Sequence, residues 1–107
     1  MPISEQTRDG HPLALLMGGF TIFEIAELKD ALLHALHMAP DTLEIDLSGV
    51  EELDTSGVQV LLLLKQEAAR LQKSVHYSRH SPAVLAVIDL LNLAGTLGDP
   101  VLMPNGS

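Results

Sequence analysis

Residues 43–64 read LEIDLSGVEELDTSGVQVLLLL, and this stretch sets the organisation that we predict for the whole chain. Residues 43–48 alternate between apolar and polar side chains, a period of two that is typical of a half-buried strand. We expect a turn over residues 49–53 and the start of a helix at residues 54–57, followed by a very apolar run. A strand that passes through an acidic turn into an apolar helix therefore lies at the centre of the predicted fold.

Two hydroxyl residues, Thr55 and Ser56, stand at the predicted start of this helix. Ser56 and Gln59 have the spacing of a capping box, so we predict that Ser56 caps the helix. The free N–H groups and the dipole of a helix N-terminus favour an anion such as phosphate, whereas the carboxylates within residues 51–54 oppose one. This combination of attraction and repulsion is what a charge switch needs. Capping alone also explains Ser56, but it leaves Thr55 without a role.

The stretch over residues 47–61, LSGVEELDTSGVQVL, resembles the signature of the STAS domain, named for sulfate transporters and anti-sigma factor antagonists. That signature is a hydrophobic strand, an acidic or polar turn, and then Asp-Ser/Thr-Ser/Thr/Ala-Gly opening a helix. Further likeness at Gly18-Gly19 and over residues 81–91 extends the resemblance to nearly the whole chain. It implies a single STAS domain over residues 1–107, an α/β fold with a mixed, mostly parallel sheet of four to five strands and helices mainly on one face.

The patterning of the other segments agrees with this alternating order. Gly10-His11-Pro12 is predicted as a turn, Thr21 with Glu24 forms a second capping box, and Ser81 with Pro82 starts the last helix. The order β, β, α, β, α, β, α is typical of an α/β domain, and the clean period of two predicts that one sheet face stays partly wet. The sequence predicts strands over residues 3–8, 13–17, 43–48, 74–78 and 101–103, helices over residues 20–38 and 57–73, and a last helix that starts at residues 81–82.

Composition excludes several classes of function. The net charge of −8 argues against nucleic acid and anionic membrane surfaces, which require Lys and Arg. The chain has no Cys, so disulfides and thiol chemistry are excluded. It has neither a long apolar run nor the pattern of a signal peptide, so we expect a cytoplasmic protein without direct membrane insertion.

Catalytic and metal sites find little support in the sequence. Five histidines are present, but the pairs His34 with His37 and His76 with His80 lack the usual metal-binding spacing, so we expect no metal. A single Asp-Thr-Ser-Gly cannot supply the two carboxylates of an aspartic protease, and no glycine-rich phosphate loop is present. We therefore expect no enzyme activity and no cofactor.

The resemblance implies a protein-binding module controlled by phosphorylation, like an anti-sigma factor antagonist. Its partner would be an anti-sigma factor that is also a serine/threonine kinase of the histidine-kinase-like ATPase type. The position of the phosphorylated residue in the family falls on Thr55, with Ser56 as the second choice. The alternatives are an accessory subunit that contacts the ATPase of a lipid-transport ABC complex, and a regulator of a chemotaxis or two-component circuit; a homodimer stays open. The predicted partner-binding residues are Asp54, Thr55, Ser56, Gly57, Val58, Gly19, Phe20 and Phe23.

Overall fold

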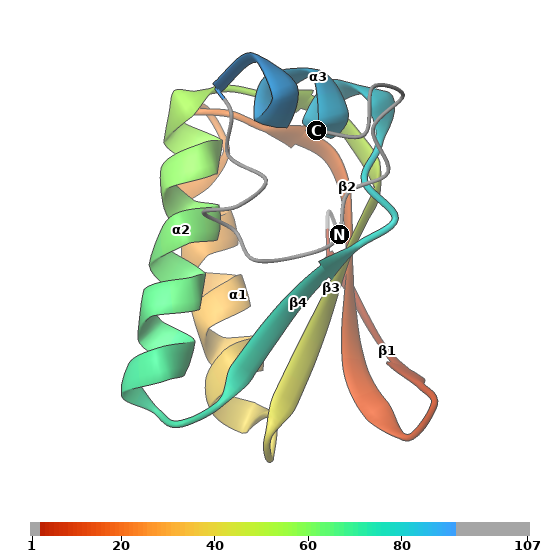
Figure 1. Cartoon of the computed structure of the whole chain (residues 1–107), viewed down its shortest axis with the longest axis vertical. Coiled ribbons are helices and arrows are strands. Elements are labelled where there is room, and N and C mark those ends of the chain that lie inside the picture. Colours follow the sequence, from red (N-terminus) through yellow and green to blue (C-terminus); the bar gives the residue numbers. More distant parts are fainter. Residues whose placement is uncertain (1–2, 92–107) are drawn as a thin grey trace.

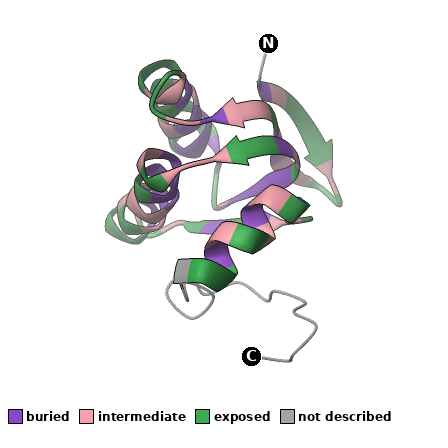
Figure 2. Cartoon of the chain, turned by 90° about the horizontal axis from the view of Figure 1, so that it is seen from above, coloured by how far each residue is buried: buried purple, intermediate pink, exposed green. Residues whose placement is uncertain are grey.

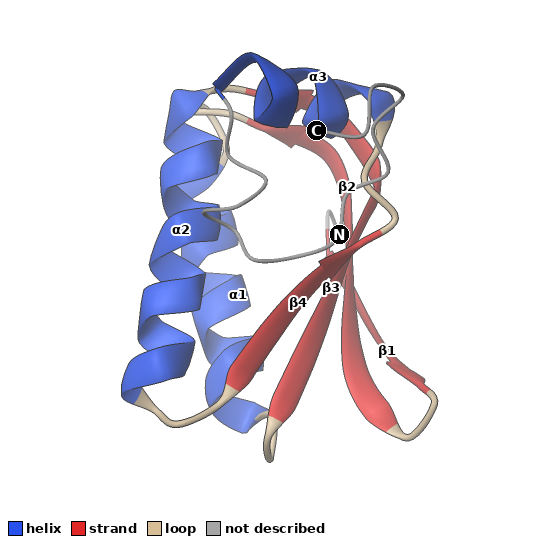
Figure 3. Cartoon of the chain, viewed as in Figure 1, coloured by secondary structure: helices blue, strands red, loops and turns tan. Residues whose placement is uncertain are grey.

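The computed structural model describes residues 3–91. Its strands and helices follow the order predicted from the sequence, and the predicted strand over residues 101–103 lies outside the described residues. Figure 3 shows the elements β1 (Ile3–Arg8), β2 (His11–Phe20), α1 (Ile25–Met38), β3 (Thr42–Leu53), α2 (Thr55–Arg70), β4 (Ser74–Ser78) and α3 (Pro82–Leu91).

The four described strands form one sheet in the order β1-β2-β3-β4. The pair β1–β2 is antiparallel, and the pairs β2–β3 and β3–β4 are parallel. The helices α1 and α2 make the crossovers that the two parallel pairs require. They lie side by side on one face of the sheet, while α3 packs against β3 at one end of it (Figure 1). The predicted mixed, mostly parallel sheet with helices mainly on one face is confirmed.

A two-residue turn joins β1 and β2. Asp9 and Gly10 both have a positive φ, of 51° and 83°, which is the requirement of the type I′ turn that fits the twist of a hairpin. Arg8 consequently pairs with His11. The turn predicted over residues 10–12 was therefore placed too late in the chain.

The central strand β3 is longer than its sequence pattern predicts. The predicted turn over residues 49–53 is wrong, because β3 continues to Leu53 and pairs there with the last residue of β2, Phe20. The register shifts in this part of the pair, so the simple period of two is lost. A Cβ at Gly49 would come within 2.9 Å of Met17 Cγ, so a glycine allows the two strands to pass closely.

The core lies between the sheet and the two long helices, whose inner faces are buried (Figure 2). Apolar residues at helical spacing form one stripe on the inner face of each of the two helices, and Ile25 and Leu71 at the stripe ends are only partly buried. Leu62 and Leu63 are only partly buried on the flank of α2. The buried stripes are formed by Leu28, Leu32 and Leu36 of α1 and by Leu61, Leu64 and Ala68 of α2.

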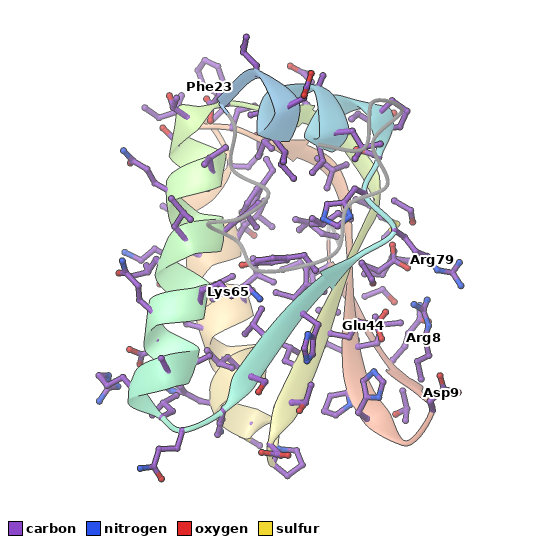
Figure 4. The ribbon with its side chains drawn as sticks, in the orientation of Figure 1. Arg8, Asp9, Phe23, Glu44, Lys65 and Arg79 are labelled. Carbon is purple, nitrogen blue, oxygen red and sulfur yellow. The ribbon has the colours of Figure 1, made fainter. Side chains whose placement is uncertain are left out.

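The opposite face of the sheet carries buried charge. Arg8 donates to Glu44 at 2.6 Å and to Asp46 at 3.1 Å, and Figure 4 shows Arg8 and Glu44 on the side away from α1 and α2. Burial by itself raises the pKa of Asp46, but hydrogen bonds from Ser48 and Arg8 outweigh it and hold that pKa below 3.8. The sheet face that was predicted to be partly wet is therefore polar, but part of it is shielded from solvent, since Asp46 is only 2% exposed.

Candidate functional site

The order of elements brings three chain segments together at one end of the sheet: the end of β2, the end of β3 and the start of α2. Gly57, in the first turn of α2, lies directly against the end of β2. A Cβ on Gly57 would collide with the carbonyl oxygen of Phe20 and lie 2.6 Å from Leu53 Cδ1. Only glycine allows this close approach, so the Gly of the Asp-Thr-Ser-Gly sequence has a packing role.

Asp54, rather than Ser56, caps α2. Asp54 has an extended backbone, and its Oδ1 accepts a hydrogen bond from the Gly57 N–H at 3.0 Å. Ser56 is already the second residue of the helix, so it is too far along the chain to act as the N-cap. The predicted capping box of Ser56 and Gln59 is therefore wrong by two residues.

The same carboxylate also holds the loop that follows β2. Oδ2 of Asp54 accepts a hydrogen bond from the Ile22 N–H at 2.9 Å. The backbone donors of Ile22 and then Gly57 hold the pKa of Asp54 below its ordinary value of 3.8. One ionised side chain thus joins residues 21–24 to the N-terminus of α2.

Residues 21–24 form a turn before α1 instead of its first helical turn. Oε1 of Glu24 accepts from the Thr21 hydroxyl at 2.7 Å and from the Thr21 N–H at 2.9 Å. Both bonds lower the pKa of Glu24, and the bond from the hydroxyl has the larger effect. The glutamate half of the predicted capping box is present, but the helix predicted from residue 20 begins only at Ile25, because Phe20 still belongs to β2.

This turn leaves two large apolar side chains in solvent beside the start of α2. Ile22 is 64% exposed and Phe23 is 91% exposed; Figure 4 shows Phe23 at the end of the molecule where α2 begins. The predicted partner-binding residues include Phe23 but do not name Ile22. The available signal was the adjacent apolar pair Ile22-Phe23 soon after Gly18-Gly19. The prediction of a continuous helix from residue 20 hid this signal.

The predicted partner-binding residues divide into an exposed set and a supporting set. Thr55 is exposed as the first residue of α2, with Asp54 and Ser56 partly exposed beside it. Gly19 is partly exposed beneath the Glu24 carboxylate, which a Cβ would approach to 3.0 Å. The residues that the structure buries, and that can only support the surface from below, are Phe20, Gly57 and Val58.

Other candidate chemistry is sparse in the described part of the chain. Within residues 3–91, no three His, Cys, Asp or Glu residues lie together as a metal-binding group. His11 contacts Glu44 at 2.7 Å, and His37 contacts Glu67 at 3.1 Å. None of the helices described is long and apolar enough to cross a membrane.

The site and fold can now be compared with known proteins. The family model described as "Mlab, STAS domain" matches residues 4–103. A search of curated proteins gives no match.

Several solved structures share the fold. An anti-sigma factor antagonist from Mycobacterium paratuberculosis is 22% identical with a TM-score of 0.76, covering 97% of this chain and 88% of that one. The antagonist SpoIIAA in its unphosphorylated form is 16% identical with a TM-score of 0.69, covering 92% and 88%. A serine-to-glutamate variant of RsbS from Moorella thermoacetica is 18% identical with a TM-score of 0.71, covering 99% and 92%. Because the family model matches most of the chain, the chain belongs to the STAS domain family.

Proposed function

We propose that this protein is a phosphorylation-controlled interaction module of the anti-sigma factor antagonist type, and that it is not an enzyme. In its unmodified form it binds a kinase-type anti-sigma factor with a histidine-kinase-like ATPase domain. Phosphorylation of Thr55 by that kinase then ends the interaction. Support comes from the shared fold with two structures whose names identify them as anti-sigma factor antagonists.

One observation carries the proposal: Thr55 is exposed at the first position of α2, directly after the cap Asp54. A hydroxyl that served only the helix would be turned toward backbone donors, as the Asp54 carboxylate is. Among the described residues, the Thr55 side chain makes no hydrogen bond, and so its hydroxyl is accessible to a kinase.

The arrangement of Asp54 explains why a phosphate would act as a switch. A phosphate adds about −1.5 to −2 charges at neutral pH. Both carboxylate oxygens of Asp54 already accept hydrogen bonds from backbone N–H groups, those of Gly57 and Ile22. A phosphate on Thr55 cannot take these donors without displacing Asp54, so its charge adds to that of the exposed Glu51 and Glu52. A partner that accepts this surface in its unmodified state would then meet strong repulsion.

A second candidate function is an accessory subunit of a lipid-transport ABC complex. The observation that favours it is the threonine at position 55, because Asp-Thr is the form that such STAS subunits carry. In that case Thr55 would contact the ATPase without being modified.

Affinity purification from the native host tests the proposal. Wild type, Thr55→Glu and Thr55→Ala serve as bait, with Thr7→Glu as a matched control that adds the same charge on the exposed edge strand β1. A glutamate at the first position of a helix is compatible with its dipole, so Thr55→Glu should fold normally.

We expect wild type, Thr55→Ala and Thr7→Glu to retain a histidine-kinase-like ATPase and Thr55→Glu to lose it. Equal retention by Thr55→Glu and Thr55→Ala would overturn the switch. An ABC ATPase held by all four proteins would instead support the second candidate.

A further inference from the structure

A groove of about 580 Å³ lies between α1 and α2, next to the exposed end of α2. Its wall is mainly apolar and includes Ile22, Ile25, Leu62 and Leu63. Ile22 is well exposed, and the two leucines are only partly buried. Leu62 and Leu63, on the flank of α2, therefore line an open groove.

Lys29 also lines this groove, one helical turn after Ile25. It is exposed, and among the described residues it makes no hydrogen bond or ion pair. All six Lys and Arg residues lie in the described part of the chain, and each of the other five makes a hydrogen bond or an ion pair there. Those interactions join Arg8 to Glu44, Lys65 to the Val75 carbonyl, Arg70 to Glu67, Lys73 to the Leu36 carbonyl and Arg79 to Asp46.

Within residues 3–91, Lys29 is thus the one lysine or arginine side chain without such an interaction, and it lies at an apolar groove whose lining contains no carboxylate. In a protein with a net charge of −8, this is the place where an anionic group would meet the least repulsion. Ser56, Gln59 and Gln66 add hydrogen-bonding groups along the same lining. An apolar body with a single anionic end matches this combination.

We propose that the groove binds an aliphatic carboxylate, a free acyl chain acid. The chain packs along Ile25, Leu62 and Leu63, and the carboxylate pairs with Lys29. A volume of about 580 Å³ lies within the roughly 300–1,000 Å³ that small-molecule sites occupy. The groove borders the proposed switch surface, because Ile22 and Ser56 line it, but the proposal does not require phosphorylation of Thr55.

The size of the groove favours a small ligand over a partner helix. Nine residues line it, whereas a standard protein interface uses about 20–30 residues on each side. The stretch of α2 from Ser56 to Gln66 is about 15 Å long, at 1.5 Å per residue. A medium-length acyl chain can lie along this distance.

Titration of the isolated ¹⁵N-labelled protein with sodium decanoate tests the proposal, with amide chemical shifts as the readout. Decyltrimethylammonium serves as a probe with the same chain and the opposite charge, and both are kept below their micelle-forming concentrations. We expect saturable shifts from decanoate that cluster on residues 22–29 and 56–66, and weaker binding of the cationic probe.

Variants then separate charge from shape. Lys29→Gln should weaken decanoate binding by about fivefold, the effect of one partly exposed ion pair. Arg70→Gln removes the same charge outside the groove and should leave the affinity unchanged. Both substitutions are on exposed helix positions, so the spectra of the free variants should stay folded.

Three results would overturn the proposal: decanoate shifts that never saturate, shifts spread over the sheet, or equal affinity of wild type and Lys29→Gln. Equal binding of both probes would mark the groove as a general apolar surface, better suited to the helix of a protein partner. None of these outcomes would decide the proposed switch at Thr55, because its test measures retention of a protein partner and not binding of decanoate.

Discussion

Gly57→Ala tests how the start of α2 is built onto the sheet. The added Cβ would collide with the Phe20 carbonyl oxygen and stand 2.6 Å from Leu53 Cδ1 and 3.0 Å from Phe20 Cδ2. The Leu53 side chain can rotate away. The Phe20 carbonyl cannot, because it belongs to the backbone at the paired end of β2. The N-terminus of α2 must therefore move.

The magnitude follows from two opposing effects. Overpacking of this kind costs about 1–3 kcal/mol, and replacing Gly by Ala inside a helix recovers up to about 1 kcal/mol. Since the collision involves backbone, we expect the upper part of the cost and a net loss of about 2 kcal/mol. For a domain of this size, that lowers Tm by roughly 8–16 °C.

Chemical denaturation of wild type and Gly57→Ala, followed by circular dichroism, measures this change. An unchanged m-value would show that the variant alters stability and not the extent of the folded core. A variant as stable as wild type, or more stable, would refute the close approach of α2 to β2.

Three further predictions concern the cap of α2, the exposed ring of Phe23 and the charge of Glu67. Ser56→Ala should change the unfolding free energy by less than about 0.5 kcal/mol, because Asp54 is the cap; a loss of about 1 kcal/mol in denaturation would restore Ser56 to that role. Phe23→Ser should leave Tm unchanged, since the ring is 91% exposed, but should abolish retention of the partner in affinity purification; a lowered Tm would contradict this. Arg70 and then His37 hold the pKa of Glu67 at about 2, below its ordinary 4.5. Its contribution to stability is therefore complete above about pH 4.5 and lost as the pH falls toward 2, which denaturation across this range should show as a decline that Glu67→Gln reduces.

Local sequence pattern predicts those parts of the fold in which buried and exposed residues follow one another with a regular period. Alternation over residues 43–48 identified β3, and the apolar stripes identified the inner faces of α1 and α2. The extension of β3 over residues 49–53 was not predictable in this way. It depends on β2 continuing alongside as a partner, and the shifted register removes the alternation.

The candidate site shows the same limit. Asp54, Thr55 and Ser56 are all suitable N-cap residues by type, and the sequence pattern favoured Ser56. The tertiary structure decides for Asp54, because its second oxygen accepts from Ile22, which is 32 residues away. Likewise, the ion pair between the partly exposed Arg8 and the buried Asp46 forms because the side chain of an edge-strand residue reaches across β2 to β3. Alternation alone predicted only a partly wet face.

The central claim is that Thr55 carries the switch, and phosphosite mapping by mass spectrometry tests it most directly. The protein would be isolated from its native host and separated into a partner-bound and a free fraction. The account predicts phosphate on Thr55 in the free fraction and unmodified Thr55 in the bound fraction. An unmodified Thr55 in both fractions, or phosphate on Thr55 within the bound complex, would contradict it.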